Sequence, residues 1–433
     1  MAATATVQPT SVHSAETLLF FVLLQLTIIT LAGRLGGVLA QRFRQAIVTG
    51  EIIAGILLGP SLFGSLLPGV FEYVFRSTPP QSMYVLSQIG LILLMFNIGM
   101  EFDFWHLHEK GNRELVTRIT IAGLVAPFVL GLGIGYYSAG TLSPGTDPLL
   151  SGLFVATAFS ITALPVLGRI MIECNMHDHP LGVVAISAAA ITDLVGWLLL
   201  AVVTAITLAQ FDVLNFALRA GGIALFGAIC WWGVRPLLKA AVRRLFQGNN
   251  GTGQINDNLL AILLVVIFAA AMCTYQLGVF AVFGAFMIGV LLHDETALLR
   301  AWKERVGRFV NVFFLPIFFT YTGLRTTIGG LDSLALWTWC LLFLFLATLG
   351  KYGATYLAAR RSGLGKDESS VLGVMMNTRG LVELIVLNIG LDLAVISRQV
   401  FTMLVIMAIV STLLTTPVLH RHMTRIPLAG RGV

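Results

Sequence analysis

Apolar runs of about twenty residues, separated by short polar gaps, recur along this 433-residue chain and constrain its fold more than any other feature. Runs of that length match the hydrocarbon core of a bilayer, which is about 30 Å thick. Only 11% of the residues are charged, 57% are hydrophobic, and the mean hydropathy is +0.88. Soluble domains carry roughly a quarter charged residues, so this composition excludes an ordinary soluble enzyme, a disordered protein and a nucleic-acid binder. The sequence therefore predicts an all-α polytopic membrane protein.

The number of spans follows from hydropathy and is tested by charge. We predict thirteen transmembrane helices, at residues 17–33, 46–66, 83–102, 116–137, 151–171, 181–208, 215–234, 258–276, 279–293, 309–323, 334–357, 371–391 and 399–418. With an external N-terminus, 21 of the 27 lysines and arginines fall on the cytoplasmic side and 4 outside, while Lys351 and Arg379 lie within spans. This bias predicts that the N-terminus lies outside and the C-terminus inside a bacterial-type plasma membrane.

An odd number of spans suggests two six-helix units of opposite orientation joined by one helix, which is typical of secondary transporters. We therefore predict an external tail, a first inverted repeat, a linker helix with a cytoplasmic loop, a second inverted repeat and a cytoplasmic tail, at residues 1–16, 17–208, 209–257, 258–419 and 420–433. We expect no cleavable signal peptide, because residues 1–16 carry no lysine or arginine. No Walker sequence is present, which argues against a nucleotide-driven pump.

The chain shows little sign of a cofactor. The four cysteines are far apart and form no CxxC pair, so they support neither a disulfide framework nor a zinc site. No cluster of histidines with metal-ligand spacing and no nucleophile–base pair is evident. We predict no cofactor, no transition metal and no enzymatic activity.

One carboxylate, Asp193, lies at the centre of the sixth span, about twelve residues from either end. A short charged side chain at that depth costs at least about 2.5–3.5 kcal/mol. We interpret Asp193 as a binding carboxylate in a water-filled cavity, where it holds either a cation or a proton. The alternative is a structural partner for a buried lysine or arginine.

Three further charges lie in spans eleven and twelve. Lys351 either faces the same cavity as Asp193, where it stabilises the empty carboxylate or carries a proton, or extends to the membrane surface. Arg379 and Glu383 have i, i+4 spacing, which favours an ion pair that is mainly structural, with coupling to transport as the alternative. Glu51, near the cytoplasmic start of span two, either lines an entrance funnel or is interfacial.

Two spans contain helix-breaking sequences. Pro165 in span five removes a backbone donor. Span twelve contains Asn377, Thr378 and Gly380 at a matching depth. These are the fifth spans of the two predicted repeats, and broken helices in corresponding positions predict an ion site. Thr162 offers a hydroxyl and a carbonyl suited to a hard monovalent cation.

These features resemble the monovalent cation:proton antiporter superfamily, in particular its branch of bacterial K⁺(Na⁺)/H⁺ antiporters and plant cation/proton exchangers. The resemblance covers about residues 17–419 and is most specific at residues 50–61 (GEIIAGILLGPS), 160–165 (SITALP), 192–193 (TD) and 376–384 (MNTRGLVEL). It implies a Na⁺/H⁺ antiporter-like fold of two inverted repeats, with a scaffold bundle that dimerises and a mobile core bundle. It also implies that the fifth and twelfth helices cross beside Asp193, which binds cation and proton in competition, and that Lys351 lies near them.

The sequence departs from this family pattern at Thr192, which replaces the first of two adjacent aspartates found in electrogenic members. With one titrating carboxylate, a one-for-one electroneutral exchange is the simpler expectation. The potassium-efflux members that carry a C-terminal nucleotide-binding domain are matched only in part.

We therefore predict a secondary antiporter that exchanges K⁺ or Na⁺ for H⁺ by alternating access, with Asp193, Thr162 and Thr192 as the binding residues. Its expected partners are the two ions, the lipid bilayer and a second copy of the chain, without nucleic acid. The first alternative is a proton-coupled exporter of an organic cation or ionophore-like metabolite on the same scaffold, and the second is a channel.

Overall fold

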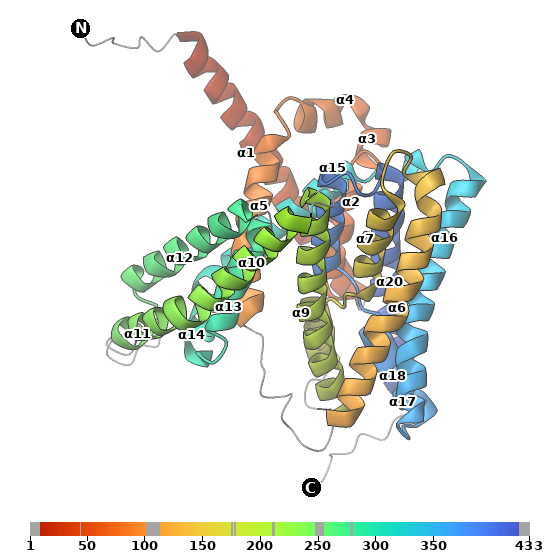
Figure 1. The fold of residues 1–433 in the computed structure, drawn as a ribbon. Coiled ribbons are helices and arrows are strands. Elements are labelled where there is room, and N and C mark those ends of the chain that lie inside the picture. The colour runs from red at the N-terminus through yellow and green to blue at the C-terminus, as the bar shows by residue number, and fades with distance from the viewer. Residues whose placement is uncertain are drawn as a thin grey trace.

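The computed structural model describes residues 9–43, 45–100, 113–174, 176, 179–209, 213–246, 255–277 and 280–423. Residues 1–8 and 424–433 of the predicted tails, and residues 247–254 of the predicted cytoplasmic loop, lie outside this description. Every regular element of the described part is helical (Figure 1). The predicted all-α membrane architecture is therefore confirmed.

The helices alternate between long continuous segments and short pieces. In chain order the α-helices are α1 (Pro9–Arg42), α2 (Ile47–Leu57), α3 (Phe63–Leu66), α4 (Pro68–Phe71), α5 (Gln81–Met100), α6 (Arg113–Leu142), α7 (Pro148–Ser160), α8 (Leu164–Glu173), α9 (Pro180–Ala209), α10 (Val213–Ile229), α11 (Arg235–Phe246), α12 (Asp257–Gln276), α13 (Ala281–Leu291), α14 (Thr296–Trp302), α15 (Leu315–Arg325), α16 (Leu334–Thr348), α17 (Ala354–Arg361), α18 (Lys366–Met376), α19 (Leu381–Asp392) and α20 (Arg398–Met423). Short π-helical or 3₁₀ segments continue or connect them: η1 (Glu72–Arg76), η3 (Cys230–Val234), η4 (Lys303–Gly307), η5 (Val310–Phe314), η6 (Ile328–Gly330) and η7 (Leu349–Gly353).

Each predicted span overlaps a helical segment, although some of these segments are too short to cross a membrane as one helix. Eight helices of the described part are long and apolar enough to cross a membrane, and two bent pairs bring that number to ten. The remaining apolar helices, α2, α7 and α13, are shorter. Within the span expected at 46–66, α2 ends at Leu57 and helix resumes only at Phe63 in α3, because Pro60 disfavours helical backbone at the residue before it. The total of thirteen spans stays a prediction.

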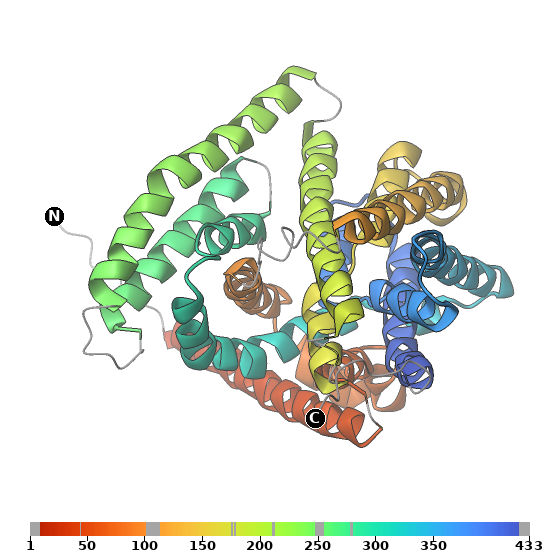
Figure 2. The same cartoon turned by 90° about the horizontal axis from the view of Figure 1, so that it is seen from below.

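The described helices pack as two bundles. A core bundle joins α6, α7, α8, α9, α16, α17, α18, α19 and α20, and a scaffold bundle joins α1, α2, α5, α12, α13 and α15. Figure 2 shows the yellow and blue helices of the core on one side and the red and teal helices of the scaffold on the other. Helices α10 and α11 lead from α9 toward α12, and α2 touches α20 where the bundles meet. This arrangement leaves the core and the scaffold as separate packing units.

Glycines allow backbones within the scaffold to touch. A Cβ on Gly289 of α13 would lie 2.3 Å from the carbonyl oxygen of Phe96 and 2.9 Å from the Cα of Gly99 on α5. Membrane helices associate through such close packing because lipid supplies no hydrophobic drive between them. The α5–α13 contact therefore depends on the absence of a side chain at Gly289.

We predict that Gly289→Ala lowers the thermal stability of the purified protein, because overpacking a tight contact costs about 1–3 kcal/mol. Gly133→Ala is the matched control, since a Cβ on Gly133 of α6 would meet nothing within 4 Å. Thermal unfolding in detergent checks the difference. Equal melting temperatures for the two variants would contradict the contact.

Candidate functional site

Two broken helices meet in the core bundle. Helix α7 ends at Ser160 and α8 begins at Leu164, while α18 ends at Met376 and α19 begins at Leu381. The amide of Ala163 donates to the carbonyl oxygen of Thr378 at 3.1 Å. The expected crossing of two discontinuous helices is therefore present.

The residues expected at the breaks have distinct backbone roles. Pro165 is the second residue of α8, where a helix tolerates the missing donor because the first amides have no helical partner. Gly380 has φ +150° and precedes α19, a conformation that L-residues with side chains rarely adopt. Asn377 and Thr378 form the non-helical link, and the side-chain oxygen of Asn377 has no hydrogen-bond partner among the described residues.

Two buried basic side chains donate hydrogen bonds to the end of α7. The last carbonyls of a helix lack helical partners, and lipid offers no water to replace them. The Arg379 guanidinium donates to the carbonyl oxygens of Ala158 and Phe159, each at 3.2 Å. The Lys351 ammonium donates to the carbonyl of Ser160. Both positive charges thus lie at the negative end of the α7 dipole.

Lys351 also donates to the carbonyl oxygen of Gly123 on α6 at 2.9 Å, and its side chain is fully buried. It does not extend to the membrane surface, which was the alternative interpretation. Lys351 lies in η7, which continues α16 and packs against α6 and α7. The ammonium therefore joins α6 to the broken end of α7.

Asp193 of α9 lies at the start of α8, on the other side of the α7–α8 break from Lys351 and Arg379. Its Oδ2 accepts the amide of Leu164, the first residue of α8, at 3.2 Å. The side chain is buried, and its Oδ1 has no hydrogen-bond partner among the described residues. A carboxylate at a helix N-terminus is favoured by the helix dipole. Asp193 therefore keeps one oxygen free for a further partner.

Two threonines belong to the same region: Thr192 precedes Asp193 on α9, and Thr162 lies in the α7–α8 break. The hydroxyl of Thr192 donates to the Ala189 carbonyl at 3.0 Å and lies 3.2 Å from the hydroxyl of Thr162. Thr162 lies 3.2 Å from the Met376 carbonyl oxygen, to which its hydroxyl donates. The three sequence-predicted binding residues are thus brought together where α9 passes the two breaks.

Arg379 and Glu383 form the expected ion pair. The guanidinium Nη1 lies 2.9 Å from Glu383 Oε1, and both side chains are buried, with 0% and 1% exposure. Glu383 Oε2 has no hydrogen-bond partner among the described residues. The Arg379 guanidinium also lies 5.8 Å from the Phe159 ring centre. Arg379 is therefore committed to Glu383 and to α7, rather than to Asp193.

A cavity of about 800 Å³ lies on the predicted cytoplasmic side, between the bundles. It reaches Leu164 and Leu381, the first residues of the helices that follow the two breaks. Its charged lining residues come from α1, α2, η4 and the residue that follows η4: Arg34, Glu51, Lys303, Glu304 and Arg308. Glu51 is buried, and its Oε1 lies 3.7 Å from the Arg34 guanidinium. Neither Asp193 nor Lys351 is among the described residues that line this cavity.

The opposite side is closed by polar contacts between the bundles. Arg325, at the end of α15, donates to Asp392 Oδ1 at 2.6 Å and to Asn388 Oδ1 at 3.1 Å, both on α19. Asn388 Nδ2 in turn donates to the Thr322 hydroxyl at 2.8 Å. The cavity that Asn388 and Asp392 line here holds only about 10 Å³. The conformation is therefore open on one side of the breaks and closed on the other.

Sequence patterns missed the groups that hold the breaks in place. The Leu164 amide and the carbonyls of Ser160 and Gly123 are backbone groups that any residue carries. Thr412 on α20, which bonds the backbone of Arg379, was also missed. Its signal was the polar cluster of residues 411–412 and 415–416 inside an apolar span.

Comparisons with known proteins bear on the family and the fold of the chain. Residues 26–424 match the family model "Sodium/hydrogen exchanger, transmembrane". The chain is 37% identical to the Na(+)/H(+) antiporter NhaS4 of Synechocystis, over 92% of this chain and 96% of that protein. It is 36% identical to Cation/H(+) antiporter 17 of Arabidopsis thaliana over 91% of its residues, but spans only 47% of that relative. The solved sodium proton antiporter MjNhaP1 of Methanocaldococcus jannaschii shares the fold, with a TM-score of 0.61, 16% identity and coverage of 94% and 98%.

We predict that Arg379→Met destabilises the protein strongly, because removing one partner of a buried pair costs about 3–5 kcal/mol. Adding Glu383→Leu is expected to recover part of this loss, since no carboxylate is then left unpaired. Recovery stays incomplete because the carbonyls of Ala158 and Phe159 lose their donors. Thermal unfolding of both single variants and the double variant measures the coupling. Losses that simply add would contradict it.

Proposed function

We propose that this chain, which belongs to the transmembrane sodium/hydrogen exchanger family, exchanges K⁺ or Na⁺ for H⁺ and that both ions bind at Asp193. As a member of that family it is a multi-pass membrane transporter and not an enzyme. The observation that carries this proposal is the free oxygen of a buried carboxylate beside two crossed helix breaks. Such a group is costly in a membrane unless a proton or cation occupies it.

The oxygens around Asp193 suit a hard monovalent cation. Oδ1 is free, and the hydroxyls of Thr162 and Thr192 donate to backbone carbonyls, so their lone pairs remain available as ligands. Carboxylate, hydroxyl and carbonyl oxygens are the ligands that hard cations prefer. A proton on Oδ1 would remove the charge that attracts the cation, so the two guests compete.

Alternating access follows from the two-bundle architecture. The cavity reaches Leu164, whose amide bonds Asp193, and Leu381, so it ends beside the two breaks on the predicted cytoplasmic side. Rocking of the core bundle against the scaffold would close this cavity and separate Arg325 from Asp392 on the other side. In this mechanism Glu51 and Arg34 lie at the cytoplasmic entrance, where they meet the cation before Asp193 does.

The hydrogen-bond partners of the buried charges favour an exchange of one proton for each cation. Glu383 is held by Arg379, and the Lys351 ammonium is held by two backbone carbonyls. Asp193 is then the one carboxylate at the breaks, among the described residues, without a basic hydrogen-bond partner. Its cation-bound and proton-bound forms carry the same charge, so the exchange is electroneutral.

Export of an organic cation is the weaker candidate. A site for a bulky organic cation is expected to carry aromatic side chains, which bind cations through their π faces. No aromatic side chain is among the described residues that line the cavity of about 800 Å³. The division into inverted repeats, the homodimer, the orientation and the bacterial-type plasma membrane remain predictions.

We predict that Asp193→Asn abolishes cation-dependent proton flux, because the amide neither titrates nor attracts a cation. The measurement is dye-reported pH change in proteoliposomes on addition of Na⁺ or K⁺, with and without a clamped membrane potential. Asp257→Asn is the control, since Asp257 is an exposed residue at the start of α12 that pairs with Arg305. Full activity of the Asp193→Asn variant would refute the proposed site.

A further inference from the structure

One hydroxyl on α20 serves both backbone groups of a residue inside the α18–α19 break. The Thr412 hydroxyl donates to the Arg379 carbonyl oxygen at 2.5 Å and accepts the Arg379 amide at 3.2 Å. Thr412 is buried, and Arg379 lies in the non-helical link where the helical ladder is interrupted. Both backbone groups would otherwise be left without this partner in a setting where unpaired groups are costly.

Helix α20 provides this contact from outside the break. It is helical from Arg398 to Met423, with Pro417 inside it, and packs on α18, α19 and α16. One turn beyond Thr412, the Thr415 hydroxyl lies 3.5 Å from that of Thr378, the residue before Arg379. The break therefore meets α20 at two successive residues, and Thr412 supplies the only backbone bonds among these described contacts.

The held segment leads directly to the ion site. The Arg379 guanidinium bonds the end of α7, and the carbonyl of the preceding residue, Thr378, accepts the Ala163 amide. The next amide after Ala163 is that of Leu164, which donates to Asp193. A shift of Arg379 would thus be passed to both ends of the α7–α8 break.

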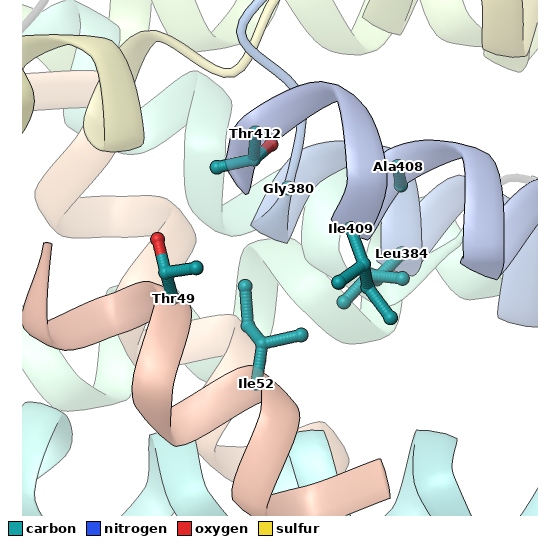
Figure 3. Close-up of a pocket in the computed structure, with 7 residues that line it drawn as sticks. All are labelled: Thr49, Ile52, Gly380, Leu384, Ala408, Ile409 and Thr412. Atoms are coloured by element: carbon teal, nitrogen blue, oxygen red, sulfur yellow. The ribbon is translucent and has the colours of Figure 1, made fainter. Parts of the chain in front are cut away.

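On the scaffold side, α2 faces this segment across a small cavity. Figure 3 shows Gly380 and Thr412 on one side of a small cavity and Thr49 and Ile52 of α2 on the other. The cavity holds about 10 Å³ and its lining is almost wholly apolar. Within the described contacts, the backbone of Arg379 is thus held from α20 and not from α2.

We propose that Thr412 is a positioning residue for the exchange: its hydroxyl fixes the α18–α19 break and thereby sets the affinity of the Asp193 site for the cation. This inference rests on the proposed function. It predicts that losing the hydroxyl weakens cation binding more than it slows the movement of the loaded core, because the bundles and their contacts are unchanged.

The test compares Thr412→Val, Thr412→Ser and Thr416→Val in proteoliposomes, with Na⁺ or K⁺ titrated against the rate of proton flux. Thr416 is the matched control, because it is buried one turn further on α20 and its hydroxyl has no hydrogen-bond partner among the described residues. Thr412→Val should raise KM about tenfold, as expected for one lost buried hydrogen-bond partner, and keep the maximal rate within about twofold. Thr412→Ser and Thr416→Val should keep the parental KM.

Each other outcome has a defined meaning. A parental KM in Thr412→Val, or a lower maximal rate with unchanged KM, would overturn the positioning role. If the valine variant is not recovered folded, Thr412→Cys replaces it, with a weaker donor and an expected KM between those of the serine variant and the tenfold value. If the parental protein itself shows no cation-dependent proton flux, the proposed function fails and the role of Thr412 falls with it. Failure of the role of Thr412 alone shows instead as parental flux with an unchanged KM in Thr412→Val.

Discussion

The structure depends on how the backbone groups released at two helix breaks are satisfied inside the membrane. An unpaired carbonyl or amide in lipid costs several kcal/mol, so a break persists only where side chains replace the missing partners. Lys351 and Arg379 take the carbonyls at the end of α7, and Asp193 takes the first amide of α8. Each of these three charges thus lies at a helix end of opposite sign.

This arrangement leaves Asp193 without a positively charged hydrogen-bond partner in the described part of the chain, although Lys351 and Arg379 are buried in the same bundle. Arg379 is paired with Glu383 and with the end of α7, and Lys351 donates to two backbone carbonyls. Neither the ammonium nor the guanidinium therefore pairs with Asp193. The Asp193 Oδ1 atom has no hydrogen-bond partner among the described residues, and our proposal assigns it to the exchanged ions. Had Lys351 or Arg379 paired with Asp193, a cation would have had to displace a buried positive charge.

Sequence alone identified the charged side chains, because an acid or base inside an apolar run is conspicuous. Asp193, Lys351, Arg379 and Glu383 were found this way, and the i, i+4 spacing also gave the Arg379–Glu383 pair. It could not give partners far away in the chain: Lys351 meets Gly123 across 228 residues, through a backbone oxygen that leaves no trace in the sequence. Thr412 was hidden for the same reason, since a threonine in a membrane helix usually bonds its own backbone.

Cation and proton competition at Asp193 is tested most directly by counting protons released when a cation binds to the purified protein. Calorimetric titration with Na⁺ or K⁺ in two buffers of different ionisation enthalpy gives that number. The account predicts close to one proton released per cation under conditions where Asp193 is protonated, an apparent affinity that weakens about tenfold for each unit of falling pH there, and no release from Asp193→Asn. Cation binding that releases no proton and is unaffected by pH would contradict it.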